Sequence, residues 1–118
     1  MKSYTDIEHS KVLAKILPLE SADYCWGIDD ETLHYNSSPY PCAWKDYSCK
    51  KYYIPCWSLS ALLSVIRETI GYTLYGVNNV YMSCDLGDKP WKLETEVYDN
   101  EVDACVEMIL KLHELNLL

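Results

Sequence analysis

The 118-residue sequence contains no phenylalanine, and its four glycines, at positions 27, 71, 76 and 87, do not form a cluster. A loop that cradles phosphate groups needs clustered glycines, so the sequence excludes a nucleotide-binding loop of that kind. No apolar run approaches the roughly eighteen residues that a membrane-spanning helix needs. The first residues lack the apolar core of a signal peptide, so we expect a cytoplasmic protein that contacts no membrane.

Closely spaced cysteines are also missing. Six cysteines are present, but no two are two to four residues apart, the spacing that is typical of zinc sites. The three histidines, His9, His34 and His113, are isolated as well. We therefore expect no metal and no cofactor. Because cytoplasmic thiols stay reduced, the cysteines are predicted to be small, buried, apolar residues.

Basic side chains are scarce, because ten lysines and arginines stand against eighteen acids and give a net charge of −8. An acidic surface repels phosphate backbones, which disfavours nucleic acid as a partner. Residues 20–31 hold five acids and no base, and residues 93–107 hold six acids and no base. Such runs predict either a solvated face or an acidic surface that attracts a basic partner.

The aromatic residues are eleven tyrosines and four tryptophans, whose polar tips are typical of half-buried positions in sheets and at interfaces. Residues 40–53 combine such rings with three lysines and a net charge of +2. We predict that this segment contacts another protein, because aromatic residues dominate interface hot spots. Two alternatives stay open. The rings pin a long loop onto the sheet, which is the more ordinary interpretation of the segment by itself, or they stack on single-stranded nucleic acid. The predicted protein-contacting residues are Tyr40, Trp44, Tyr47, Tyr52 and Tyr53.

Two helices are predicted in the first 71 residues. Thr5 is expected to cap the first helix, with Glu8 completing a capping box, and Pro18 is expected to end it. Leucine and isoleucine at helical spacing predict the second helix at residues 58–70, with Gly71 at its C-cap.

A three-stranded meander and a last helix are predicted to follow. The strands are expected at residues 72–77, 80–86 and 91–98, with a tight turn of positive φ at residues 78–79. Asn100 is a suitable N-cap for a helix that ends near Leu115. Alternation predicts that one face of the last strand is buried, the face formed by Trp91, Leu93, Thr95 and Val97.

The order of these elements predicts an α+β fold. A three-stranded antiparallel meander would pack against two or three helices, with an irregular or hairpin insertion at residues 19–53. The length predicts a single domain over residues 1–118.

Cys56 is the candidate nucleophile, because a thiol at a helix N-terminus has a lowered pKa. The segment Ile-Pro-Cys-Trp-Ser-Leu-Ser-Ala at residues 54–61 resembles the nucleophile segment of papain-like cysteine proteases over about six residues. The resemblance ends there. That family has its histidine and asparagine well over a hundred residues downstream, whereas only 62 residues follow Cys56, and this chain has no glutamine for an oxyanion hole. The alternative is a buried cysteine beside Trp57.

Three blocks, one of which includes Cys56, carry a second resemblance that extends over most of the chain. They are Ile-Leu-Pro-Leu-Glu-Ser-Ala-Asp at residues 16–23, Ile-Pro-Cys-Trp-Ser-Leu at residues 54–59 and Val-Asp-Ala-Cys-Val at residues 102–106. In these blocks the chain resembles a family of short uncharacterised proteins of Bacteroides-type gut bacteria and their phages or mobile elements. The resemblance implies a bacterial cytoplasmic setting and a mobile-element gene, and it implies no activity, cofactor or site.

The leading hypothesis is a non-catalytic binding or accessory protein that contacts another protein. One alternative is a small cysteine-dependent enzyme that uses Cys56. Another is an acidic decoy that occupies a nucleic-acid-binding protein. A homo-oligomer is compatible with each of these.

Overall fold

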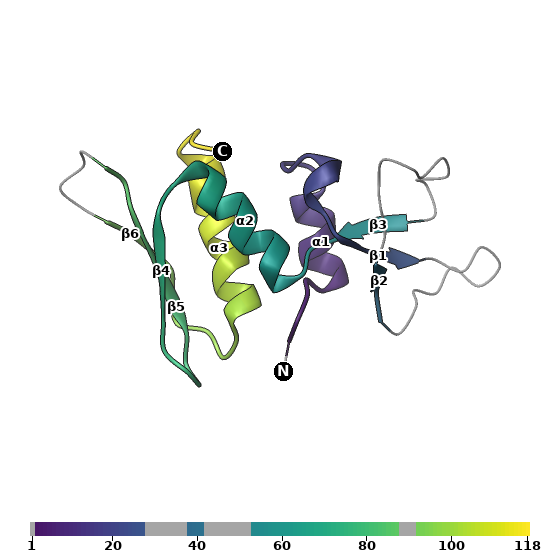
Figure 1. The fold of residues 1–118 in the computed structure, drawn as a ribbon, viewed down its shortest axis with the longest axis horizontal. Coiled ribbons are helices and arrows are strands. Elements are labelled where there is room, and N and C mark those ends of the chain that lie inside the picture. The colour runs from purple at the N-terminus through teal and green to yellow at the C-terminus, as the bar shows by residue number, and fades with distance from the viewer. Residues whose placement is uncertain (1, 28–37, 42–52, 88–91) are drawn as a thin grey trace. The chain divides into compact units, whose positions relative to one another are not determined.

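The computed structural model describes residues 2–27, 38–41, 53–87 and 92–118. The chain divides into two compact units, one of Tyr4–Ala61 and one of Leu62–Leu118 together with Met1–Ser3. The boundary falls inside helix α2 (Leu59–Thr69), and the single domain stays a prediction. The described residues form three α-helices and two three-stranded antiparallel sheets, which confirms the α+β class (Figure 1).

A three-stranded sheet builds the first unit, where the sequence predicted irregular structure or a hairpin. Its strands are β1 (Tyr24–Gly27), β2 (Tyr40–Pro41) and β3 (Tyr53–Cys56), in the order β2-β1-β3. The described residues of this unit therefore form one strand more than the hairpin that the sequence predicted.

Helix α1 (Ile7–Leu13) packs against β3 in the same unit (Figure 1). Asp6 caps it, because its carboxylate accepts a hydrogen bond from the N–H of His9 at 2.8 Å. The predicted cap, Thr5, is wrong: its side chain is buried, and its hydroxyl accepts from the N–H of Trp57 at 3.1 Å. Pro18 does not end α1, which stops five residues earlier, and it precedes the short 3-10 helix η1 (Leu19–Ser21).

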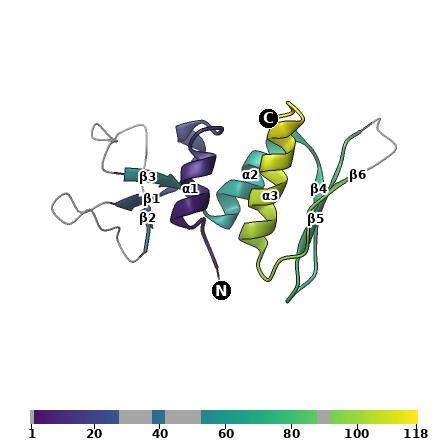
Figure 2. The same cartoon turned by 180° about the vertical axis from the view of Figure 1, so that it is seen from behind.

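The predicted meander forms the sheet of the second unit. Its strands are β4 (Tyr72–Tyr75), β5 (Tyr81–Asp85) and β6 (Lys92–Glu94), in the order β4-β5-β6. Figures 1 and 2 show the second-unit part of α2 and helix α3 (Glu101–Glu114) on one face of this sheet. The fully buried core includes Leu62, Ile66, Val80, Met82, Cys84, Cys105, Ile109 and Leu112.

Residues 76–80 connect β4 to β5, because Tyr75 pairs with Tyr81. The predicted tight turn at residues 78–79 is wrong, since the positive φ in this connection belongs to Gly76, at 94°. A Cβ atom on Gly76 would lie 2.0 Å from the carbonyl oxygen of Asn79. Only glycine fits this approach of two backbone segments.

A β-bulge interrupts the alternation after β6. Ser83 pairs with Glu94, whereas Val80 forms a bridge with Tyr98, so residues 81–82 face residues 95–97. An extra residue on one strand is what defines a bulge, and it reverses the side-chain alternation beyond it. Thr95 is buried as predicted, but Val97 is 60% exposed, so the prediction for Val97 is wrong.

Both ends of α3 have side-chain or backbone caps. The side chain of Asn100 accepts from the N–H of Asp103 at 2.8 Å, which confirms the predicted N-cap. Asn116 adopts a left-handed conformation with φ of 59°. The N–H groups of Asn116 and Leu117 donate to the carbonyls of His113 and Leu112 at 3.0 and 2.9 Å, which is the Schellman pattern.

Helix α2 agrees with the predicted bounds within one residue at each end. At its start the hydroxyl of Ser58 accepts from the N–H of Ala61 at 3.2 Å. Gly71 does not adopt the left-handed C-cap conformation that was predicted for it. Among the residues that the structure describes, no helix has both the length and the hydropathy to span a membrane.

Candidate functional site

Two of the five predicted protein-contacting residues, Tyr40 and Tyr53, lie in the described part of the chain, and Trp44, Tyr47 and Tyr52 lie outside it. Tyr40 is in β2 and Tyr53 is in β3, on opposite sides of β1. Their ring centroids are 6.3 Å apart at an interplanar angle of 87°, an edge-to-face pair. Both side chains are half-buried.

The register of the sheet explains why these two rings meet. Tyr40 lies opposite Cys25 and Tyr53 lies opposite Gly27, so all four residues are on one face of the sheet. Strands are spaced about 4.8 Å apart, so the outer strands lie about 9.6 Å apart and the rings must lean toward each other over β1. Gly27 leaves that space open because it has no side chain.

The hydroxyl of Tyr40 is held in its neutral form. Burial is the largest cause, and hydrogen bonds with the side chains of Cys25 and Tyr53 add to it, so the pKa of Tyr40 is raised above its ordinary value. The pair therefore offers an aromatic surface with an uncharged polar tip.

A second aromatic cluster lies on the opposite face of the same sheet. The ring of Tyr4 lies 6.1 Å from Tyr24 and 6.0 Å from Trp26. The indole N–H of Trp26 donates to the carbonyl oxygen of Thr5 at 3.1 Å, and this tryptophan is buried. These contacts belong to the packing around α1, so the face with Tyr40 and Tyr53 is the better candidate for binding.

Cys56 lies in surroundings that favour the protonated thiol. It is fully buried at the end of β3, three residues before α2 begins. Its Sγ donates to the carbonyl oxygen of Thr5 at 3.3 Å and accepts from the Thr5 hydroxyl at 3.5 Å. Burial raises its pKa, although hydrogen bonds from Thr5 and Ser10 act in the opposite direction. This geometry supports a packing role beside the buried Trp57 rather than a nucleophile.

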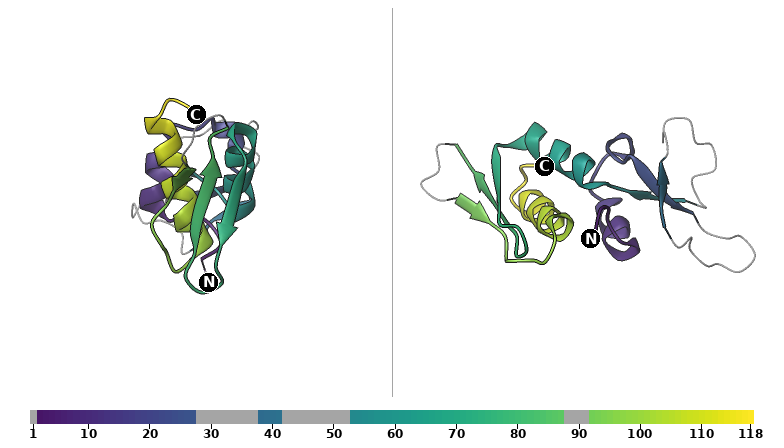
Figure 3. Two further views of the ribbon diagram at one scale, coloured as in Figure 1. Left: turned by 90° about the vertical axis from the view of Figure 1, so that its left-hand side faces the viewer. Right: turned by 60° about the horizontal axis from the view of Figure 1, so that its bottom comes forward.

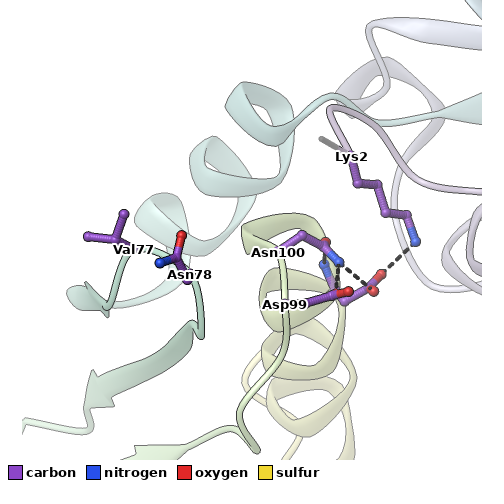
Figure 4. Close-up of a pocket in the computed structure, with 6 residues that line it drawn as sticks. Lys2, Val77, Asn78, Asp99 and Asn100 are labelled. Atoms are coloured by element: carbon purple, nitrogen blue, oxygen red, sulfur yellow. Dashed lines mark hydrogen bonds and ion pairs between the residues drawn. The ribbon is translucent and has the colours of Figure 1, made fainter.

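A cavity of about 590 Å³ opens in the second unit at the N-terminus of α3 (Figure 4). The side-chain amide of Asn100 donates to Asp99 at 2.7 Å and to Asp103 at 2.9 Å. Lys2 forms an ion pair with Asp103 at 2.6 Å. Lys2, Asp99, Asn100 and Asp103 therefore already bind one another around the helix cap. Its lining residues are Lys2, Val77, Asn78, Asp99, Asn100 and Asp103.

The sequence did not single out a further tyrosine pair on the second sheet. Tyr75 and Tyr81 are paired in β4 and β5, with ring centroids 4.8 Å apart and an interplanar angle of 16°. Strand alternation alone could have placed both on one face, but their pairing depends on the length of the loop between the strands.

Comparison of the chain with protein-family models, with curated proteins and with solved structures gave no match. The resemblance to proteins of Bacteroides-type bacteria stays a prediction.

Proposed function

We propose that this protein is a non-catalytic binding protein, which contacts another protein through the sheet face that carries Tyr40 and Tyr53. The observation that supports it is the half-buried, edge-to-face pair of rings over Gly27. Tyrosine is enriched at interface hot spots. Rings that already hold each other in place lose little conformational freedom when a partner binds.

A protein partner agrees better with the charge of the chain than nucleic acid does. The net charge of −8 opposes a phosphate backbone, whereas an aromatic protein contact needs no net positive charge. The bacterial, mobile-element setting that the resemblance implies belongs to this same proposal.

Site-specific photo-crosslinking tests the proposal. A benzophenone amino acid replaces Tyr53 in one variant and Tyr4, on the opposite sheet face, in the control variant. In bacterial extract, the Tyr53 variant should give a discrete adduct that excess unlabelled protein suppresses. Unlabelled protein with Tyr40→Leu and Tyr53→Leu should not suppress it. Equal adducts from both positions, or equal suppression by both competitors, would refute the proposal.

The alternative of an acidic decoy rests on the acidic runs at residues 20–31 and 93–107. The second run lies in the described part of the chain. Some of these acids have internal partners: the carboxylate of Glu107 accepts from the N–H of Glu96 at 2.7 Å, and Asp103 binds Lys2. These internal contacts therefore explain part of the acidic run without a basic partner.

A further inference from the structure

The second unit has one sheet face that no described helix covers. Figure 3 shows β4, β5 and β6 in front of α2 and α3, which lie together behind the sheet. Met82 and Val80 are buried on the helix side, so the residues that alternate with them point to the other side. This outer face carries Tyr75 and Tyr81 as a stacked pair.

The β-bulge adds Val97 to the same face. Val80 is opposite Tyr98 on the helix side, so Val97 lies on the outer side across from Tyr81. Tyr75, Tyr81 and Val97 thus form a row across three neighbouring segments, which we call the outer row. Tyr75 is 39% exposed and Val97 is 60% exposed. Val77, which follows Gly76 in the adjoining loop, is 86% exposed.

An apolar row with a polar border is typical of an interaction surface. Without the bulge, the alternation would turn Val97 toward the helices. The bulge instead places it beside the tyrosine stack, and bulges often redirect side chains at functional positions. Val97 adds nothing to the buried core in this position. Core packing therefore does not explain why the bulge places Val97 on the outer face.

Charge indicates what this face binds. Residues 62–118 contain ten acids and four bases, a net charge of −6. On the outer face Asp85 and Glu94 stand against Lys92, and all three are exposed. A second copy of the chain or a nucleic acid would bring further negative charge to this face, which opposes both as occupants.

A hollow of about 180 Å³ lies at the opposite end of the outer face from the outer row. Its lining includes the side chains of Thr73, Ser83, Asp85 and Lys92. Asp85 supplies the negative charge of this lining, and the positive charge of Lys92 lies beside it. Tyr81 and Asp85 are four positions apart in β5, which corresponds to about 13 Å along an extended strand.

We propose that the outer face of the β4-β5-β6 sheet is a docking surface for a positively charged, extended segment of another protein. A guanidinium group stacks on the exposed ring of Tyr75 or on the half-buried ring of Tyr81. A second cationic side chain, four residues along the partner, reaches Asp85 in the hollow, where the carboxylate and the hydroxyl groups accept its hydrogen bonds. This surface is distinct from the face with Tyr40 and Tyr53.

Fluorescence polarisation with short labelled peptides tests the proposal on the full chain. The probe is Arg-Thr-Val-Thr-Arg, and the matched control is Glu-Thr-Val-Thr-Glu. We expect binding of the arginine peptide alone, weakened by salt. Tyr75→Ala should weaken it about tenfold, Asp85→Asn should weaken it as well, and Lys92→Glu should strengthen it. Tyr53→Leu should leave the affinity for the arginine peptide unchanged. The experiment can therefore refute this docking surface without refuting the proposed function.

Val97→Thr tests the surface without disturbing the fold, because the side chain is largely exposed and the change in size is small. It should weaken the arginine peptide several-fold without changing thermal unfolding. Equal binding of both peptides, no binding of the arginine peptide at about 1 mM protein, or weaker binding by Lys92→Glu overturns the proposal. A dimer in sedimentation that Val97→Glu dissociates would identify a second copy as the occupant instead. Direct binding of labelled single-stranded DNA to the protein, weakened by Tyr75→Ala, would identify nucleic acid as the occupant instead.

Discussion

The side-chain hydroxyl of Thr95 accepts the hydrogen bond of the Met82 N–H, in the place where a regular strand would offer a backbone carbonyl. The N–H of Met82 donates to the hydroxyl oxygen of Thr95 at 2.9 Å, and the N–H of Thr95 donates to the carbonyl oxygen of Met82 at 2.9 Å. The Thr95 hydroxyl donates in turn to the carbonyl of Glu96 at 2.9 Å. The bulge that exposes Val97 is therefore stabilised by one hydroxyl group.

Replacing that hydroxyl with a methyl group should destabilise the protein. In Thr95→Val the buried N–H of Met82 loses its acceptor, and we expect the free energy of unfolding to fall by about 1–3 kcal/mol in urea. Thr95→Ser keeps the hydroxyl and should lose less. An equal loss in both variants would show that the methyl group, not the hydrogen bond, stabilises the bulge.

Gly76 should not tolerate a side chain. Its φ of 94° is unfavourable for other residues, and a Cβ atom would lie 2.0 Å from the Asn79 oxygen. Gly76→Ala should cost roughly 1–3 kcal/mol. At Gly71 a Cβ atom meets nothing within 4 Å, so Gly71→Ala is the control and should be neutral or stabilising by up to about 1 kcal/mol. Chemical denaturation that ranks the two variants equally would contradict this account of the loop.

Thr5 should matter more for its hydrogen bonds than for its packing. Its hydroxyl accepts from the N–H of Trp57 at 3.1 Å and contacts the hydroxyl of Ser10 at 2.7 Å. Thr5→Val leaves the Trp57 N–H unsatisfied, so the melting temperature should fall by about 5 °C or more. Thr5→Ser retains the hydroxyl, and a melting temperature as low as that of Thr5→Val would argue against this role.

Asn100 should stabilise α3 through its cap. Asn100→Ala removes the acceptor for the Asp103 N–H, and a loss of about 0.5–2 kcal/mol is expected. Serine is the appropriate control, because aspartate would add a third carboxylate beside Asp99 and Asp103. Circular dichroism during thermal unfolding should place Asn100→Ser between the wild type and Asn100→Ala, and an unchanged Asn100→Ala would refute the prediction.

Alkaline pH should destabilise the second unit through its buried thiols. Burial raises the pKa of Cys84 to about 11 and that of Cys105 to about 12, from an ordinary value of 9.0. The unfolded chain loses these protons first, so the stabilisation is present in full below pH 9 and is lost as the pH rises toward 11 to 12. Unfolding in urea at stepped pH measures this slope.

Tyrosines titrate in the same range, so the slope has to be compared with that of a variant that lacks these two thiols. Cys84→Ala with Cys105→Ala should be less stable at neutral pH, because each change leaves a cavity. Its stability should nevertheless fall less steeply between pH 9 and pH 11. Identical slopes would show that these two thiols do not cause the alkaline loss.

The helices and the meander could be predicted because their signals are local. Apolar residues at helical spacing predicted α2 within one residue at each end, and Asn100 was found as the cap of α3. The five-residue aromatic site was predicted from composition, and two of its members, Tyr40 and Tyr53, form a ring pair. What composition could not show is that Gly27 leaves the space in which the rings meet.

Two of the errors arose because a segment distant in the chain changed the local structure. Thr5 has the side chain of a helix cap, but the N–H of Trp57 takes its hydroxyl and Asp6 caps α1 instead. Val97 follows the alternation of a buried strand face, but the bulge at Thr95 turns it outward. Both outcomes depend on partners distant in the chain.

The sequence by itself determined the α+β class, the order of the main elements and the acidic charge. Helix periodicity and caps involve residues within about four positions, so their information is contained in short segments. The tertiary structure alone decided the pairing of β1 with β2 and β3, the bulge, and which tyrosines meet. Strand register joins segments tens of residues apart, and one added residue reverses the face of every side chain that follows.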